Sequence, residues 1–380
     1  MIRLTLPGTI LACLAAAAAV VVAASAPAES ATTNVNRVSG LQHDLEALVA
    51  AGAPGAILFV RDGDGTAILT AGLGDIARKT PMRADNHFKI ASVTKSFTAT
   101  VVLQLVGEGK LRLEDTVDRH VPRLVPNGSR ISVRQLLNHT SGLHDFEVNP
   151  RYLKPYLNGD FAHYWAPRQL VRMGVSQKPL FAPGTDYSYS NTNYVVAQLI
   201  VEKITGKPLG AELKRRIFEP LRLHDTSYAT RRPGLPSPYA HGYTLLGKPP
   251  LADVTGLSPS LAPGSGGIIS TVRDVAHFYR ALLAGRLLKP AQLRAMKTTV
   301  SERTGKLVSS GRGDGLGIGR AGTHCVGWGH SGELPGYDVQ TVFSEDGRRQ
   351  AVLMINQDAT TLPKPALALY SKLIERAFCG

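Results

Sequence analysis

The chain has 380 residues, 43% of them hydrophobic, and a formal net charge of +14. A chain of this length and apolar content can bury a sizeable core, as one large domain or two fused ones, and this excludes an intrinsically disordered protein. The positive charge is compatible with nucleic acid, an anionic membrane surface or an anionic cell-wall polymer as a partner. The basic residues are scattered, however, and the densest run, Lys214-Arg215-Arg216, falls in an expected helix, where such a run is usually a solvated face.

The first 31 residues differ in kind from the rest. Arg3 gives a short positive start, an alanine-rich apolar run extends from Ile10 to Ala24, and small residues follow. This layout is typical of a secretory signal peptide, and the apolar run is shorter than the roughly 20 residues that span a bilayer. We therefore expect a signal peptide at 1–31, a single domain at 32–380, a secreted or cell-envelope location, no stable membrane span after signal removal, and no nucleic acid partner.

Two cysteines, Cys325 and Cys379, lie beyond the expected signal peptide. In an exported protein an even pair suggests one disulfide, which would join a late strand to the C-terminal helix; the alternative is two free thiols. The sequence has no Cys-x-x-Cys and no ordered spacing of His, Asp and Glu ligands, so we expect no metal site and no cofactor.

The first third of the domain predicts a helix followed by a hairpin. Apolar residues recur at helical spacing from Val38 to Ala51, and strand-like runs follow at Gly55–Val60 and Ala67–Ala71. The segment 62–65 between them, Asp-Gly-Asp-Gly, is typical of a hairpin turn. The region from about 111 to 261 is helical and rich in loops, Pro and Gly, with a short helix within 131–143 that we expect to end at Gly142 and a longer one through Tyr194 and Ile204.

The last third returns to strands. Candidates are Leu316–Ile318, Val326–His330, Val339–Phe343 and Ala351–Ile355, with a hairpin turn at 346–347 and a closing helix at Leu367–Phe378. Strands at both ends around a helical insert predict an α+β fold, an α/β sandwich in which an antiparallel sheet built from both termini is covered by helices. A mainly helical second region, at about 111–261, would lie beside it.

The chain is organised around Ser92-x-x-Lys95. Apolar residues recur at helical spacing after it, so Ser92 lies where a loop becomes a helix, and Lys95 lies one turn further on the same face. A serine hydroxyl becomes a nucleophile when a base is within hydrogen-bond reach, and burial lowers the pKa of a lysine enough for it to be that base. The motif alone is short, and it equally fits an N-cap serine followed by a solvated lysine.

Two further elements follow in order, Tyr189-Ser190-Asn191 and His330-Ser331-Gly332. Penicillin-recognising serine enzymes carry a related trio, Ser-x-x-Lys, Ser-Asp-Asn and Lys-Thr-Gly. The chain resembles the class C-like group of the serine beta-lactamase and penicillin-binding protein superfamily, especially the exported serine D-alanyl-D-alanine carboxypeptidases of actinomycetes. The resemblance runs from about Leu41 to Gly380 and includes the stretch Leu136-x-x-His139-x-Ser141-Gly142-Leu143, and it extends to the cysteine pair.

The resemblance implies a beta-lactamase/transpeptidase-like fold and a role for each matched residue. Ser92 would attack an acyl carbon, Lys95 would accept its proton, and Tyr189 would relay a proton to the leaving group. Asn191 would hold the amide side chain of the substrate, and His330, where many relatives have lysine, would titrate within the working pH range. Backbone N–H groups of Ser92 and Glu333 would form the oxyanion hole, and the substrate-binding residues would be Asn191, Ser331, Gly332, Glu333 and Arg320.

Three positions depart from this pattern. The arginine that seats a terminal carboxylate in the family falls at Gly319, with Arg320 one place further on, and Leu261 stands where relatives have tryptophan. Glu333 replaces a threonine, and its carboxylate would repel a substrate carboxylate unless Arg320 neutralises it. These changes weaken the expectation of carboxypeptidase specificity but leave acyl-enzyme chemistry intact.

We therefore expect an exported serine hydrolase that acts on peptidoglycan peptides like a D-alanyl-D-alanine carboxypeptidase and is acylated by beta-lactams. One alternative keeps the mechanism in an esterase, a beta-lactamase or a D-amino-acid amidase, in which Glu333 could bind a substrate amine. Another is an inactive binding protein with the penicillin-binding fold. The intact Ser92, Lys95 and Tyr189 argue against that last alternative.

Overall fold

The structure, a computed structural model, describes residues 28–380 apart from 229, 232–233, 247–248, 309–312 and 322–324. Most of the expected signal peptide lies outside these residues. A helix, α1 (Ala28–Ala50), begins the described chain, starting earlier than the predicted helix. Among the described residues, no helix is both long and apolar enough to cross a membrane.

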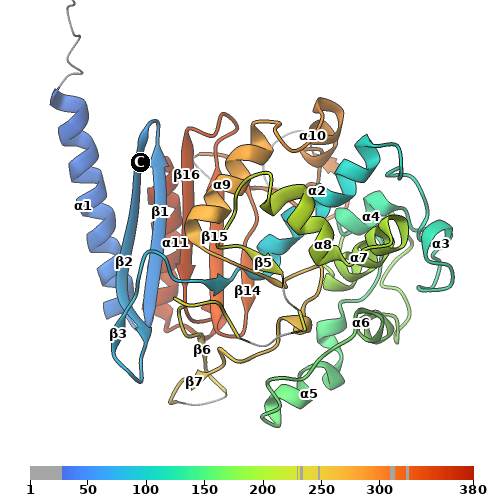
Figure 1. Cartoon of the computed structure of the whole chain (residues 1–380), viewed down its shortest axis with the longest axis horizontal. Coiled ribbons are helices and arrows are strands. Elements are labelled where there is room, and N and C mark those ends of the chain that lie inside the picture. The colour runs from blue at the N-terminus through green and yellow to red at the C-terminus, as the bar shows by residue number, and fades with distance from the viewer. Residues whose placement is uncertain (1–27, 229, 232–233, 247–248, 309–312, 322–324) are drawn as a thin grey trace, which may run out of the picture.

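An antiparallel sheet forms the centre of the molecule, and both ends of the chain contribute to it (Figure 1). The N-terminal hairpin of β1 (Gly55–Asp62) and β2 (Gly65–Asp75) lies beside the C-terminal hairpin of β15 (Tyr337–Phe343) and β16 (Arg349–Ile355), with β1 paired to β16 from Ala56↔Ile355 to Asp62↔Arg349. The full order is β10-β9-β11-β12-β13-β15-β16-β1-β2-β3, with β14 paired to β15. The bounds of the remaining strands of this sheet are β3 (Thr80–Pro81), β9 (Thr299–Val300), β10 (Leu307–Val308), β11 (Gly313–Asp314), β12 (Gly319–Ala321), β13 (Gly327–Gly329) and β14 (Gly332–Leu334). The predicted sheet built from both termini is confirmed.

Both faces of the sheet are buried, which explains why its central strands are continuously apolar rather than alternating. Along β1, Ile57 and Phe59 belong to the large core under the helical region, whereas Leu58 and Val60 belong to a second core. That second core is closed by α1 and by the C-terminal helix α11 (Lys364–Cys379), which lie together on one face. On the other face α9 (Val272–Leu283) packs against β1 and β16.

The helical region lies beyond α9 and contains the predicted insert (Figure 1). Its centre is α2 (Thr94–Gly107), which is buried along most of its length and packs against α7 (Asn191–Thr205). The other helices are α3 (Val117–His120), α4 (Val133–Leu137), α5 (Pro150–Leu157), α6 (Pro167–Gly174), α8 (Leu209–Leu213) and α10 (Pro290–Met296). Two small sheets complete the fold, β4 (Phe88–Lys89)-β8 (Ile268–Ser270)-β5 (Ser227–Tyr228) and β6 (Tyr243–Thr244)-β7 (Ala252–Asp253).

Two predicted elements are wrong. Leu316–Ile318 is not a strand but the turn between β11 and β12. The side chains of Leu316 and Ile318 are buried in the core, which accounts for the apolar pattern. Gly317 between them has a φ of +77°, which only glycine adopts easily. The helix expected to end at Gly142 ends at Leu137 instead. It is followed by His139, which has a φ of +61°.

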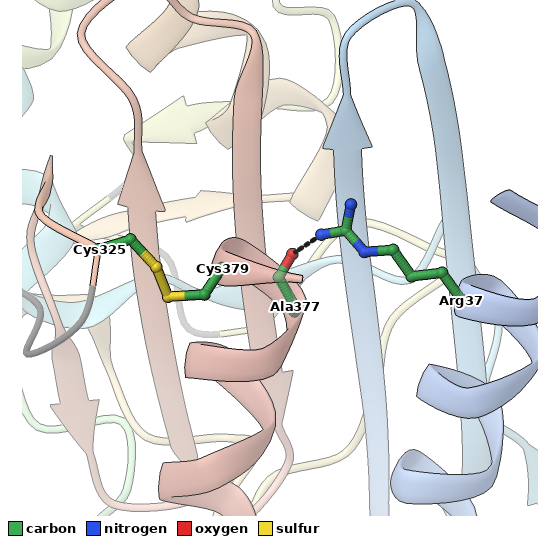
Figure 2. The surroundings of a disulfide bond; sticks show 4 residues. All are labelled: Arg37, Cys325, Ala377 and Cys379. Atoms are coloured by element: carbon green, nitrogen blue, oxygen red, sulfur yellow. Dashed lines mark hydrogen bonds between the residues drawn. A yellow bond between two sulfur atoms is a disulfide. The ribbon is translucent and has the colours of Figure 1, made fainter. Parts of the chain in front are cut away.

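A disulfide joins Cys325, just before β13, to Cys379 at the end of α11, as expected (Figure 2). The same end of α11 is held from the other side by α1, because the Arg37 guanidinium donates a hydrogen bond of 2.9 Å to the carbonyl of Ala377. Arg37 also forms an ion pair with Asp62 at the end of β1. The last helix is thus fixed to a late strand and to the N-terminal helix.

We predict that the paired changes Cys325→Ser and Cys379→Ser lower the free energy of unfolding by about 2–4 kcal/mol. The disulfide closes a loop of 54 residues, and without it the unfolded chain gains conformational entropy. Urea unfolding monitored by circular dichroism measures the change. Reductant should lower the wild-type midpoint to that of the double variant and leave the variant unchanged. A wild-type midpoint that does not respond to reductant would contradict the prediction.

Candidate functional site

Ser92 lies in a short 3₁₀ turn, Ala91–Val93, that runs directly into α2. Its neighbour Ala91 is fully buried with a φ of +48°, a left-handed conformation that is unfavourable for alanine. Gly332 of β14 packs against this turn: an added Cβ there would lie 2.4 Å from the carbonyl oxygen of Ile90 and 3.1 Å from the backbone nitrogen of Ser92. The third motif is therefore in van der Waals contact with the first.

Lys95 is fully buried on the first turn of α2 and points at Ser92. Its Nζ donates to the Ser92 Oγ at 2.9 Å, to the Asn191 Oδ1 at 2.6 Å and to the carbonyl of Ser265 at 3.1 Å. Burial lowers the pKa of Lys95 to about 7, although the nearby carboxylates of Glu147 and Asp145 act in the opposite direction. Once neutral, the amine keeps two N–H donors and has a lone pair available for the proton of the Ser92 hydroxyl.

Tyr189 lies on the other side of this pair. The Lys95 Nζ is 4.9 Å from the centre of the Tyr189 ring. Burial raises the pKa of Tyr189 well above 10, and a hydrogen bond with the Ser92 side chain offsets that rise only in part. The phenol is therefore protonated at neutral pH and can donate its proton.

Asn191 begins α7 and connects Lys95 to an acidic group that the sequence analysis did not identify. Its Nδ2 donates at 2.9 Å to the Oδ2 of Asp145, which also accepts from the backbone N–H of Asn191. Glu147 lies two residues further on, at the surface of the cleft. Its side chain is exposed to the cleft, yet enclosure by the cleft walls and the charge of Asp145 raise its pKa to about 7. Neither carboxylate belongs to a local motif. The nearest signal in the sequence is the stretch 136–143 around His139, which lies just upstream of them.

The residues of the third motif form one wall of the site. His330 is half-buried, with its ring centre 6.3 Å from that of Tyr189. The expectation that His330 titrates within the working range is wrong: burial, together with the charge of Lys95, lowers its pKa to about 4, so the imidazole is neutral at neutral pH. Ser331 is exposed at the cleft, and Glu333 accepts a hydrogen bond of 2.8 Å from the Thr360 hydroxyl.

These residues surround a cavity of about 510 Å³. The described lining is Ser92, Glu147, Tyr152, Leu153, Tyr189, Asn191, Ala262, Gly266, His330, Ser331, Glu333, Leu334, Pro335, Asp358 and Thr360. Three carboxylates, those of Glu147, Glu333 and Asp358, line it, and no arginine or lysine is among the described lining residues. In the described part of the chain, no group of three or more His, Cys, Asp or Glu residues could hold a metal ion.

Arg320 lies in an adjoining cavity of about 260 Å³, which shares Tyr189, His330 and Ser331 with the larger one. Asp314 and Glu302 line this smaller cavity beside Arg320. Glu333 and Arg320 therefore line different cavities. Leu261, at the position where relatives have tryptophan, is buried, and its carbonyl accepts from the Tyr152 hydroxyl at 3.0 Å.

The structure thus brings together Ser92, Lys95, Tyr189, Asn191, His330, Ser331, Gly332 and Glu333, from three distant segments, and leaves Arg320 in the adjoining cavity. A buried lysine beside a serine hydroxyl, in a cleft between an antiparallel sheet and a helical region, defines a serine hydrolase of the beta-lactamase/transpeptidase fold. The beta-lactamase family model matches residues 41–374, and the chain belongs to that family.

Solved structures of amide-cleaving enzymes are similar along nearly the whole chain. The D-stereospecific amidohydrolase from Streptomyces sp. is 37% identical with a TM-score of 0.81, covering 90% of this chain and 98% of that one. The D-amino acid amidase from Ochrobactrum anthropi SV3, in complex with L-phenylalanine amide, is 30% identical with a TM-score of 0.80, covering 90% and 97%. Among curated relatives, penicillin-binding protein 4* of Bacillus subtilis (strain 168) is 29% identical over 81% of this chain and 69% of its own length. The D-aminopeptidase of Brucella anthropi is 27% identical over 80% of this chain, which spans 56% of that enzyme.

We predict that the rate at which a fluorophosphonate labels Ser92 rises with pH up to about 7 and is constant above it, because the neutral form of Lys95 accepts the proton. The change Glu147→Gln should move this inflection to lower pH, because it removes a negative charge that raises the pKa of Lys95. Stopped labelling reactions analysed by intact mass measure the rates.

The matched control is Glu46→Gln, an exposed carboxylate on α1 at the opposite face of the sheet, which should leave the inflection in place. An inflection that moves to higher pH in Glu147→Gln, or a labelling rate that falls as pH rises to 7, would contradict the assignment.

Proposed function

We propose that the protein is an exported serine hydrolase that forms an acyl-enzyme at Ser92 and hydrolyses amide bonds. The observation that carries the proposal is the buried amine of Lys95, 2.9 Å from the Ser92 Oγ. Ser92 attacks the carbonyl carbon and gives its proton to neutral Lys95. The Tyr189 phenol gives a proton to the departing nitrogen as the amide bond breaks, and recovers one from Lys95. Water then cleaves the ester by the reverse transfers and frees Ser92.

Backbone N–H groups of Ser92 and Glu333 are assigned to the oxyanion hole. Gly332 supports this assignment, because its missing Cβ lets β14 approach the Ser92 turn closely. Hydrogen bonds aimed at the developing negative charge typically lower a barrier by a few kcal/mol. Asn191 keeps the Lys95 amine aligned from one side, and its expected contact with a substrate amide remains a prediction.

We assign to the substrate a free amino group on the acyl side, as in a D-amino acid amide or a short peptide with a D-residue at its N-terminus. The lining carboxylates of Glu147, Glu333 and Asp358 attract an ammonium group and repel a carboxylate. We infer the D-configuration of the substrate from the similarity of this chain to a D-stereospecific amidohydrolase and a D-amino acid amidase. Glu333 is one of the three departures from the carboxypeptidase pattern, and in this proposal its carboxylate binds a substrate amine.

A second candidate is D-alanyl-D-alanine carboxypeptidase-like cleavage of peptidoglycan peptides, with beta-lactams as acylating ligands. Arg320 favours it, because a guanidinium in the adjoining cavity can bind the carboxylate of a leaving D-alanine by two hydrogen bonds. Asp314 and Glu302 in the same cavity weaken that attraction. An extracellular or cell-envelope location fits both candidates.

We predict that a fluorescent penicillin adds a single adduct to the wild type and none to Ser92→Ala, as measured by intact mass. The serine is the acyl acceptor in every candidate enzyme, so this result separates an acyl-transferring enzyme from an inactive binding protein with the same fold. A wild type that takes up neither penicillin nor a nitrophenyl ester would contradict acyl-enzyme formation.

We predict that Glu147→Gln lowers kcat/KM for a D-amino acid amide by roughly 10- to 100-fold, the usual effect of removing a charge-assisted hydrogen bond. The N-acetylated amide should be hydrolysed slowly and should be little affected by the change, because it has no ammonium group. Assays at pH 7.5 suit this comparison, because Lys95 is then mostly neutral while the α-amino group of the substrate is still mostly protonated.

Arg320→Gln is the matched variant for the second candidate. It should leave hydrolysis of the free amide unchanged. If the wild type releases D-alanine from an acyl-D-Ala-D-Ala tripeptide, and Arg320→Gln loses that reaction while Glu147→Gln does not, the carboxypeptidase candidate replaces the amidase.

A further inference from the structure

His139 lies directly behind Tyr189. It is fully buried, and its ring stacks on the Tyr189 ring with centres 4.3 Å apart and planes 27° from parallel. Such close stacking restricts the rotation and tilt of both rings. His139 itself is not among the described residues that line either cavity.

His139 also binds the backbone on both sides of Tyr189. The N–H of Ser190 donates to the His139 Nδ1 at 3.1 Å, and the N–H of Ser188 donates to the His139 carbonyl at 3.0 Å. The extended stretch 188–190 is therefore fixed before and after the tyrosine. A segment without regular secondary structure is thereby held to one orientation.

The hydrogen bond from Ser190 also determines which ring nitrogen of His139 carries a proton. A backbone N–H can only donate, so Nδ1 is the acceptor and the proton is on Nε2. Burial, together with the charge of Lys95, lowers the pKa of His139 well below 6.5, so the imidazole stays neutral. A neutral ring whose free lone pair is already used cannot take the serine proton, and it adds no charge beside Lys95.

The left-handed backbone of His139 is part of the same arrangement. Its φ of +61° turns the chain sharply after α4, which directs both its carbonyl and its ring at the segment 188–190. Among residues with a Cβ, Asn, Asp and His tolerate this conformation best. The residue at this position thus has to accept the turn, stack on a phenol and accept a hydrogen bond.

We propose that His139 is a positioning residue that holds the Tyr189 phenol in line with Ser92 through ring stacking and two backbone hydrogen bonds. The inference rests on the proposed function, in which Tyr189 transfers the proton to the leaving group. A displacement of about 1 Å in a proton donor is enough to slow a reaction about 10²-fold.

The test is a double-mutant cycle between positions 139 and 189. His139→Gly keeps the left-handed backbone and removes the ring, and we expect it to lower kcat/KM for a D-amino acid amide, which reports acylation of Ser92, roughly 10- to 100-fold. His139→Asn should lose less, since Asn tolerates the same backbone and its Oδ1 is the same number of bonds from Cα as the histidine Nδ1. In a Tyr189→Phe background both changes should have little further effect, because the group they position is gone.

A merely structural role gives a different pattern. It would slow acylation by the same factor with or without the Tyr189 hydroxyl, and that additivity would overturn the proposal, as would a wild-type rate in His139→Gly. Thermal unfolding shows whether each variant is folded, and if His139→Gly is not, the cycle is read from His139→Asn.

A second readout does not depend on activity. In protein labelled with 3-fluorotyrosine, the ¹⁹F resonance lost in Tyr189→Phe belongs to Tyr189, and removal of the His139 ring should shift and broaden it. An unchanged resonance overturns the proposal. If the wild type forms no adduct at Ser92, the proposed function fails, and the fluorine resonance alone then decides whether His139 holds Tyr189.

Discussion

The site depends on the burial of one amine. The Lys95 Nζ donates hydrogen bonds to the hydroxyl of Ser92, the side-chain amide oxygen of Asn191 and the carbonyl of Ser265. These acceptors lie 3, 96 and 170 residues away in the sequence, so the amine holds three segments of the chain together. Taking an ammonium group out of water costs several kcal/mol even when it is hydrogen-bonded. The chain reduces that cost by satisfying every donor and by lowering the pKa of the group to about 7, so that the uncharged form is readily available. The burial that makes the charged form of Lys95 unfavourable is therefore also what makes the lysine a base at neutral pH.

A second buried lysine shows that burial alone does not define the site. Lys89, on β4, also has a pKa lowered to about 7 by burial, and its Nζ donates to the carbonyls of Thr255 and Leu257 and lies 5.6 Å from the centre of the Tyr337 ring. Among the described residues, its Nζ makes no hydrogen bond to a hydroxyl, and Lys89 is absent from the described lining of the cavity. Lys89 fixes the loop that leads to Ala262 and Ser265, whereas Lys95 acts on Ser92. The nearby hydroxyl, and not the depressed pKa, distinguishes the two.

Local patterns were enough to predict the hairpin of β1 and β2, the helix α7 and the sheet built from both termini, because each has a strong periodicity or turn signal. They failed for the turn at Leu316–Ile318, where burial in the core, and not strand pairing, explains the apolar side chains. The three motifs identified the residues around Ser92, since each is recognisable within a few positions. No local pattern identifies Asp145 and Glu147. They matter because the fold brings the loop before α5 close to the start of α7 and to Lys95, and this contact between distant segments leaves no local signal in the sequence. His330 was expected to titrate, and only its burial beside Lys95 shows that it stays neutral.

The interleaving of the two ends of the chain has a consequence for the order of assembly. Strand β1, near the start, has β16 as one neighbour, and the wall of the site at 330–333 lies only a short distance before β16 in the sequence. Pairings between such distant segments form late in folding, because a long loop must close first. A chain still being synthesised therefore holds Ser92 and Lys95 without the strand that faces them. Reactivity toward acyl groups arises only when the last segments have been released and have paired with the first.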